Sequence, residues 1–494
     1  MSQFYLRWRY GNKAAPSETL RVGRSSTAMS APPRAAKAFD RSIVEGPILG
    51  AVWKLAWPTV LTNLIGGLQG VVDHAMVGHF VGYTGNAAIG VSIQIFLVVI
   101  TFVMSLYTGM GVLVARFTGA NDHDNVNRSV YQAFLTSVGL SFGVLAPVGW
   151  FLAPGMLSLV NAAPEVQVAA LPYLRIMFVG SFGMLLFFML GGALRAAGDA
   201  RTPLRLGVGM TILNIIFNVI LIRGLGPIPA LGVAGAALGT MLAGLIMSVV
   251  GLRLLLSGDA VVQWHRGMNW KPDWTIIRQL FKFGLPAGFQ GVAMNLAGVF
   301  LLRFIGSLPE SAEAQAAYAV GYTELFSLIT WTSVGLMGAA AAVAGQNLGA
   351  GKPERTAAAV STASRLGLGI AATVGLMFVT MPRVLLGAFG MTDPTVVTIG
   401  VQLLGFLSVS GFFVTVALTY TGGLQGTGDT KGPLFISIIS QIIVPLGLCS
   451  VLQATRGLQA TDIWTAIVLG HMTRALLSVV RFRRGRWREI EVVG

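Results

Sequence analysis

Long apolar runs alternate with short polar segments along most of the chain. Twelve of these runs approach or exceed about 20 residues, the length that an α-helix needs to cross the hydrocarbon core of a bilayer. The pattern predicts helices at residues 50–79, 86–114, 128–151, 166–194, 203–222, 233–256, 277–305, 314–345, 357–382, 395–423, 432–453 and 462–482. The sequence therefore predicts an all-α integral membrane protein with twelve transmembrane helices.

A repeated segment divides the predicted helices into two sets of six. The stretch Gly192–Leu204, GALRAAGDARTPL, returns 230 residues later as Gly422–Leu434, GGLQGTGDTKGPL. The pair Gly119-Ala120 recurs at the same offset, and Pro58 recurs as Pro286 at an offset of 228. A repeat of this length indicates two structural copies of one half. Because six is even, both copies enter the membrane from the same side, as in transporters built from parallel repeats.

The repeat also sets the expected domain boundaries. We expect a basic, disordered N-terminal tail, an N-lobe with helices 1 to 6, a cytoplasmic link, a C-lobe with helices 7 to 12, and a short C-terminal tail. These segments are predicted at residues 1–47, 48–256, 257–282, 283–485 and 486–494. The tail is rich in Arg and Ser and poor in acidic residues, which is also typical of an organellar transit peptide.

Composition agrees with a membrane protein. Of the 494 residues, 54% are hydrophobic and only 11% are charged, whereas soluble domains carry about 25% charged residues. The single cysteine, Cys449, excludes an internal disulfide and a cysteine metal cluster. The chain contains no GxxxxGK[ST], HExxH or CxxC pattern, so nothing in it indicates an enzyme.

The formal charge of +15 is explained by topology rather than by a nucleic-acid partner. Basic residues gather on the cytoplasmic side of membrane proteins. With the N-terminus inside, 29 of the 34 Lys and Arg residues fall on the inner side. Both termini and both copies of the GD-containing loop are therefore predicted to be cytoplasmic. In that loop glycine ends one helix and Asp can cap the next, so a tight helix–helix turn explains the motif better than transport chemistry.

Carboxylates inside apolar helices mark functional positions, because a charge in the bilayer is costly. Two such residues occur, Asp73 in the first helix and Glu324 in the eighth. Asn214 and Asn218 lie four residues apart on one face of the fifth helix, and Thr240 lies in the sixth. We predict that these three side chains form a cation-coupling site with Asp73. The structural alternative is a buried hydrogen-bonded cluster that joins the three helices.

The second half of the chain favours the coupling site over the structural alternative. At the equivalent positions it carries Leu301, Val444, Leu448 and Gly470, so the same fold forms there without the polar set. Burial disfavours the charged form of a carboxylate, which allows it to take up and release a proton. Asn and Thr oxygens could also complete the shell of a sodium ion at Asp73. The coupling ion is left open between the two.

Glu324 has aromatic neighbours in the sequence. We predict that Glu324, Tyr322 and Trp331 contribute to a substrate site, since a carboxylate beside aromatic faces suits an organic cation. Packing of interface aromatics around one helix-bound Glu is the alternative.

Taken together, these motifs resemble the multidrug and toxic compound extrusion (MATE) transporters of bacterial type. The matching segments are Leu55–Pro58 (LAWP), Asp73–Gly78 (DHAMVG), Gly345–Gly351 (GQNLGAG) and the two GD loops. The resemblance covers about residues 48–485. It implies a V-shaped pair of lobes that exports amphipathic or cationic compounds by alternating access, in exchange for protons or sodium ions. It also implies a bacterial inner-membrane location, small organic substrates, a monomeric state and no cofactor.

The resemblance assigns the central coupling role to Asp73, with Asn214, Asn218 and Thr240 as companions. Some members have Asp where this chain has Asn218, and others carry carboxylates in the second lobe near Met294, Asn295 and Val414, where this chain has none. A flippase of lipid-linked precursors from the same superfamily is the main alternative function. A channel or a membrane scaffold is a further alternative, and a two-lobe repeat with an embedded carboxylate argues against it.

Overall fold

The computed structural model describes residues 38–81, 83–160, 163–265 and 267–492. Within these ranges the chain is helical, and the single β pairing is an isolated bridge between Leu225 and Ile228. Eleven helices in this part of the chain are long and apolar enough to span a membrane, or twelve when one bent pair is counted as a span. The prediction of an all-α protein with twelve spans is confirmed.

The first half contains six spans with short connections. Its helices are α2 (Ile48–Phe80), α3 (Tyr83–Gly119), α4 (His123–Leu140), η1 (Ser141–Leu145), η2 (Val148–Leu152), α5 (Ala153–Leu159), α6 (Pro164–Val179), α7 (Ser181–Ala196), α8 (Arg201–Arg223) and α9 (Gly232–Ser257). The segments η1 and η2 are π-helical and interrupt the span that begins with α4. The axes of α6 and α7 differ by 49°, and Gly180 separates them.

The second half repeats this order. Its helices are α10 (Trp274–Ile305), α11 (Ser311–Tyr318), η3 (Ala319–Leu325), α12 (Ser327–Gly349), α13 (Pro353–Thr380), α14 (Pro382–Ala388), α15 (Pro394–Gly426), α16 (Lys431–Ser437), η4 (Ile438–Ile443), α17 (Val444–Thr455), α18 (Ala460–Arg483) and η5 (Arg486–Glu489). Among these, η3 and η4 are π-helical and η5 is a 3₁₀ helix.

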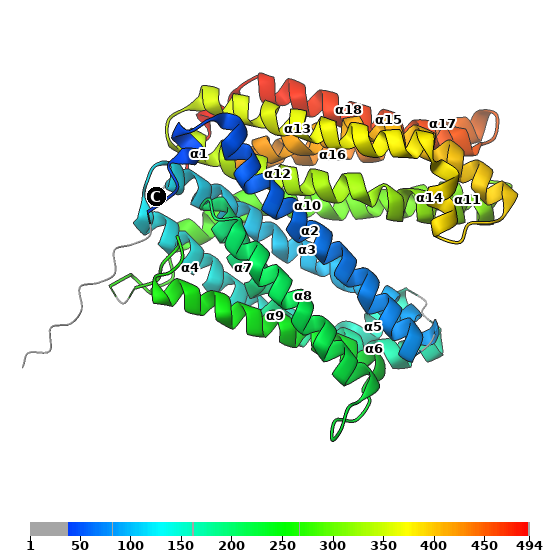
Figure 1. Ribbon diagram of the computed structural model, residues 1–494, viewed down its shortest axis with the longest axis horizontal. Coiled ribbons are helices and arrows are strands. Elements are labelled where there is room, and N and C mark those ends of the chain that lie inside the picture. The colour runs from blue at the N-terminus through cyan, green and yellow to red at the C-terminus, as the bar shows by residue number, and fades with distance from the viewer. Residues whose placement is uncertain (1–37, 82, 161–162, 266, 493–494) are drawn as a thin grey trace, which may run out of the picture. The chain divides into compact units, whose positions relative to one another are not determined.

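Two large apolar clusters form most of the core. One extends from Phe39 to Phe283 and so includes the start of α10, and the other extends from Leu301 to Ile467. A smaller buried cluster joins α1 and α2 to α12 and α13 across the two halves. In Figure 1, α13, α15 and α18 lie side by side within the second half. The halves meet where α2 packs on α12 and where α3 packs on both α10 and α12.

The repeated glycines of the sequence lie where the two halves cross. A Cβ atom on Gly119, at the end of α3, would collide with the carbonyl oxygen of Gln346. In the reciprocal position, a Cβ atom on Gly349, at the end of α12, would collide with the carbonyl oxygen of Arg116. Only glycine allows the backbones to approach this closely, which explains why the pair is present in both copies.

The two GD loops are tight turns, as predicted. Gly198 and Gly428 have φ of 96° and 99°, values that favour glycine. Asp199 Oδ1 accepts hydrogen bonds from the backbone amides of Arg201 and Thr202 at 3.1 and 3.0 Å, at the start of α8. Asp429 accepts one from Gly432 at 3.1 Å. The motif therefore stabilises a helix–helix connection.

The end of the predicted link and the predicted C-terminal tail both differ from the structure. The helix α10 begins at Trp274, inside the predicted link, because the Asp273 side chain caps its first turn by accepting from Thr275 and Ile276. At the C-terminus, Trp487 is buried and donates from Nε1 to the Phe482 carbonyl at 2.8 Å. Residues 486–492 therefore pack on the helices rather than extend from them.

The N-terminal tail was predicted to be disordered through residue 47, but residues 38–47 are folded. They include the four-residue helix α1 (Ser42–Glu45), in which Ile43 and Val44 are buried. Residues 1–37 of the predicted tail lie outside the described residues. The sequence pattern misses this segment because tertiary contacts, and not periodicity, hold so short a helix.

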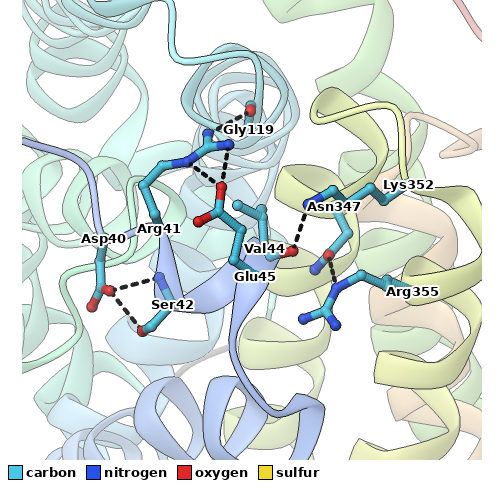
Figure 2. A network of polar contacts seen from close by, with 9 residues as sticks. All are labelled: Asp40, Arg41, Ser42, Val44, Glu45, Gly119, Asn347, Lys352 and Arg355. Carbon is cyan, nitrogen blue, oxygen red and sulfur yellow. Dashed lines mark hydrogen bonds and ion pairs between the residues drawn. The ribbon is translucent and has the colours of Figure 1, made fainter.

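Polar contacts fix α1 to both halves, as Figure 2 shows. The Arg41 side chain donates to the Gly119 carbonyl at 3.3 Å in the first half. Three side chains of the second half donate to carbonyls of α1 or of Gly46, which follows it: Asn347 to Ile43 at 3.3 Å, Lys352 to Val44 at 3.1 Å and Arg355 to Gly46 at 2.7 Å. We call this set of contacts the α1 anchor.

Asp40 adds an ion pair with Lys54 to the α1 anchor. Partial burial alone would raise the pKa of Asp40, but the hydrogen bonds from Lys54 and Ser42 outweigh burial and lower that pKa. A carboxylate whose pKa is lowered on folding stabilises the folded state above its ordinary pKa. Its contribution is lost as the pH falls through the lowered value.

Candidate functional site

The four predicted coupling residues come together between α2, α8 and α9. Asn218 donates from Nδ2 to Asp73 Oδ1 at 2.6 Å, and the same Nδ2 lies 3.3 Å from Asn214 Oδ1. Asn214 in turn donates from Nδ2 to Thr240 Oγ1 at 2.9 Å. Thr240 completes the chain by donating to the Ala236 carbonyl at 3.1 Å. A continuous hydrogen-bonded path therefore links the carboxylate of α2 to α9.

Burial differs along this path. Asn214 and Asn218 are fully buried, whereas Asp73 and Thr240 are partly buried. Asn218 Oδ1 is buried and has no hydrogen-bond partner in the described part of the chain. An unpaired buried acceptor is costly, so a proton-bearing group or a cation that reached this oxygen would stabilise it.

A glycine explains how α8 and α9 approach closely enough to build the path. A Cβ atom on Gly239 of α9 would collide with Asn218 Oδ1. Small residues allow such close helix packing in membranes.

The structure adds residues that were not predicted. Thr211 of α8 donates to Gln69 Oε1 of α2 at 3.1 Å, about one turn from Asp73 along α2 and about two turns from Asn218 along α8. Helical spacing could have indicated both, since Gln69 precedes Asp73 by four positions and Thr211 precedes Asn214 by three. The buried Tyr173 of α6 lies within Coulombic range of Asp73. No local signal in the sequence connects Tyr173 with that carboxylate.

The predicted substrate residues of the second half are placed differently from one another. Glu324 is exposed within η3. The Tyr322 ring instead stacks on Tyr318, with centroids 4.9 Å apart, and packs in the second apolar core. Trp331 is 42% exposed and faces α2, where a Cβ atom on Gly67 would lie 3.5 Å from its ring. The structure therefore does not gather the three side chains into one site, and their role in substrate binding stays a prediction.

A second polar cluster, in the core of the second half, was also not predicted. His471 Nδ1 of α18 lies 2.5 Å from Ser410 Oγ of α15. Arg474, one turn further along α18, is 7% exposed, and its Nε atom has no hydrogen-bond partner among the described residues. The sequence prediction missed His471 and Arg474 because it chose the coupling and substrate sites by carboxylates within apolar helices.

No group of three or more His, Cys, Asp or Glu side chains that could hold a metal ion occurs in the ranges that the structure describes. The Asp73 cluster supplies one carboxylate, two amides and one hydroxyl. Such a set can bind and release a proton at the carboxylate, and its oxygens can also contact a hard cation.

Comparison with known proteins identifies the family. The sequence model of the MatE family matches the chain twice, at residues 58–220 and 286–450. The two matches fall in the two halves and together cover more than half of the chain. This chain belongs to the MATE family. The resemblance inferred from the motifs is confirmed, and the chain is a multi-pass membrane transporter of that family.

Curated relatives match this MATE chain over nearly its full length. The Thermotoga maritima protein described as "Probable multidrug resistance protein NorM" is 27% identical over 449 residues, which is 89% of this chain and 93% of the relative. The Pseudomonas aeruginosa "Multidrug resistance protein PmpM" is 27% identical over 452 residues, which is 88% of this chain and 91% of the relative.

Solved structures share the fold. One is described as the outward-facing conformation of a multidrug resistance MATE family transporter of the MOP superfamily. It superposes with a TM-score of 0.84 at 21% identity and covers 92% of this chain and 100% of its own. At this identity the likeness shows the architecture alone.

Proposed function

We propose that this MATE protein is a secondary active antiporter that exports amphipathic or cationic organic compounds in exchange for protons. The names of the relatives support efflux of drug-like molecules. The observation that carries the proposal is the hydrogen-bonded path from Asp73 to Thr240, which ties one embedded carboxylate to three helices of the first half.

The donor set favours a proton over sodium as the coupling ion. A single carboxylate neutralises one positive charge, and protonation cancels its own charge without further ligands. A sodium ion would have to lose water and be surrounded by several oxygens. Among the described amide oxygens of the cluster, Asn218 Oδ1 alone lacks a hydrogen-bond partner. The other oxygens around a sodium ion would become available only if the existing hydrogen bonds of the cluster were broken.

The proton would act through the contact between α2 and α8. Ionised Asp73 attracts the Asn218 amide, and their 2.6 Å hydrogen bond holds the two helices together. Protonation removes the charge and weakens this bond. The helix α2 contains Pro58, and it also carries the pair Gly66-Gly67, so it can bend when that restraint is released. Bending would reshape the surface on which the substrate is bound.

The bacterial relatives support a location in the inner membrane of a bacterial cell. The distribution of basic residues supports an orientation with both termini in the cytoplasm. On this orientation the crossing of α3 and α12 at Gly119 and Gly349 lies on the cytoplasmic side. We propose the monomer as the transporting unit, because each chain carries both halves.

The test is transport by the purified protein in proteoliposomes. A cationic dye such as ethidium is added outside, and a pH gradient is imposed with the interior acidic relative to the exterior. Because antiport exchanges internal protons for external dye, we expect gradient-dependent dye accumulation. An ionophore that collapses the gradient should abolish it. Dye movement equal to that in protein-free liposomes, or unchanged by ionophores, would contradict antiport.

A further inference from the structure

The most unusual basic side chain in the first half is Arg175, which lies inside a membrane span. It belongs to α6 and sits about 16 Å along the helix from Pro164, given a rise of 1.5 Å per residue. Its Nε atom is buried without a hydrogen-bond partner, and Arg175 forms no ion pair within the described residues. An uncompensated cation at this depth is costly and indicates a function.

Arg175 borders a pocket of about 410 Å³. Apart from Arg175, its walls are almost entirely apolar. They come from π-helical η1 and η2, from both sides of the bend at Gly180, and from α9. The volume lies within the range of about 300–1,000 Å³ that is typical of small-molecule sites. The pocket is therefore an apolar cavity bordered by one cation, and it lies where two neighbouring spans depart from regular α-helix.

The rim of the pocket faces outward from the helices. Phe142 is 58% exposed and Trp150 is 54% exposed, and both belong to the span that begins with α4. In a spanning segment, such exposed aromatic side chains meet lipid chains. The Arg175 guanidinium lies 5.0 Å from the centre of the Trp150 ring. This cation–π contact fixes the guanidinium at the rim but leaves its charge unneutralised.

We propose that this pocket binds an acidic phospholipid of the surrounding bilayer. Its phosphate would pair with the Arg175 guanidinium, and one acyl chain would lie against the apolar wall formed by Phe142, Val179 and Leu242. Helical side chains lean toward the helix N-terminus. The guanidinium of Arg175 therefore leans toward the membrane surface at which α6 begins, which brings it nearer to the lipid headgroups of that side.

This site is separate from the Asp73 cluster. The pocket includes Gly180, the residue between α6 and α7, so an occupant would contact both arms of the 49° bend. A bound lipid would thereby stabilise the bend. The inference does not depend on the proposed substrate or coupling ion.

The test uses Trp150 as a reporter in nanodiscs of phosphatidylcholine. Brominated phosphatidylglycerol, which is acidic, or brominated phosphatidylcholine, which is neutral overall, is added in equal amounts. The Trp150 signal is the difference between the fluorescence of the wild type and that of Trp150→Phe. We expect the acidic lipid to bind about fivefold more tightly, as judged by the lipid concentration that gives half-maximal quenching. One basic residue contributes about 1 kcal/mol to binding an anionic lipid.

Charge variants locate the effect. Arg175→Gln should remove the preference for the acidic lipid, and Arg175→Lys should retain most of it. Arg223→Gln, an exposed arginine at the end of α8 outside the pocket, is the matched control and should behave as wild type. Each variant must elute as a single species before measurement.

Three results would overturn the proposal. They are equal quenching by the two lipids in the wild type, a preference that survives in Arg175→Gln, or stronger quenching by a brominated fatty acid than by the acidic phospholipid. The last result would assign the pocket to a free carboxylate amphiphile instead. The first comparison uses no Arg175 variant, so it decides the question even when Arg175→Gln fails to fold.

Discussion

The Asp73 carboxylate supplies the only ionisable group of the hydrogen-bonded path described between α2, α8 and α9. Asn at this position keeps the size and can still bond to Asn218, but it carries no charge and binds no proton. We therefore expect Asp73→Asn to fold and insert normally and to reduce gradient-driven dye efflux to the background of empty vesicles. Initial efflux rates in proteoliposomes measure the effect.

A matched control is Asp124→Asn, which removes an exposed carboxylate from the first turn of α4. It should transport at the wild-type rate. Wild-type efflux by Asp73→Asn would return the cluster to a purely structural role, in which it joins three helices without coupling.

Glu324 is exposed in η3, so its charge is accessible to a bound cation. Glu324→Gln keeps most of the volume and removes that charge. We expect about fivefold weaker apparent affinity for cationic substrates, since such a contact contributes about 1 kcal/mol, with little change for neutral ones. Competition assays with paired charged and neutral compounds measure this. Glu310→Gln, also exposed, is the control, and equal losses for both classes would argue for packing.

The sequence predicts which side chains share a helix face only where the helix is a regular α-helix. Asn214 and Asn218 lie on a regular α-helix, so four-residue spacing correctly placed them on one face. Tyr322 and Glu324 lie in π-helical η3, where each turn holds more residues. The phase of the side chains changes there, and the sequence pattern contains no sign of it. Tyr322 and Glu324 are also only two positions apart, so they lie on different faces of a helix of either kind, and the predicted aromatic–carboxylate grouping is not formed.

At the scale of elements, apolar length predicted the spans, and capping chemistry set their ends. The Asp273 cap starts α10 at Trp274, three residues before the predicted start at residue 277. Both GD turns form as the Gly-Asp sequence predicts. The bend at Gly180 was not predicted, because a continuous apolar run fits a straight and a bent helix equally well. Nor was α1, whose stability comes from partners more than 300 positions away in the chain.

The α1 anchor yields a stability prediction. Lys352 and Arg355 donate to carbonyls at the end of α1, at 3.1 and 2.7 Å. Partly exposed charged hydrogen bonds of this kind contribute about 1 kcal/mol each. The double variant Lys352→Ala with Arg355→Ala should therefore unfold at a lower temperature in detergent, and the segment before Gly46 should become sensitive to protease.

A matched control for the anchor is Arg488→Ala. Arg488 pairs with the highly exposed Glu354 at 3.2 Å, and surface ion pairs contribute little. Its unfolding temperature should stay close to that of the wild type. An equal loss in both variants, without release of the segment before Gly46, would show that α1 is held by its buried Ile43 and Val44 alone.

At the scale of the whole molecule, the two halves share one backbone plan but differ in chemistry. Each contributes a glycine to the crossing of α3 and α12, so the repeat explains how the halves join. Only the first half carries the Asp73 path, whereas the equivalent positions of the second half hold apolar residues and glycine. The second half instead buries His471 and Arg474 in its core. Coupling is therefore expected to be one-sided, with the second half acting as the opposing wall.

One-sided coupling through a single carboxylate predicts the driving ion. Each cycle has one embedded charge to neutralise at Asp73, and one proton does so without rebuilding the hydrogen bonds of Asn214 and Thr240. Sodium would need those oxygens as ligands and would compete with the bonds that now join α8 to α9. We therefore expect a pH gradient alone to drive efflux in sodium-free vesicles. Adding sodium should change the efflux rate by less than about twofold, which corresponds to only about 0.4 kcal/mol. If the pH gradient alone drives nothing and a sodium gradient restores efflux, the same four residues form a sodium site, and Asn218 Oδ1 becomes its first amide ligand.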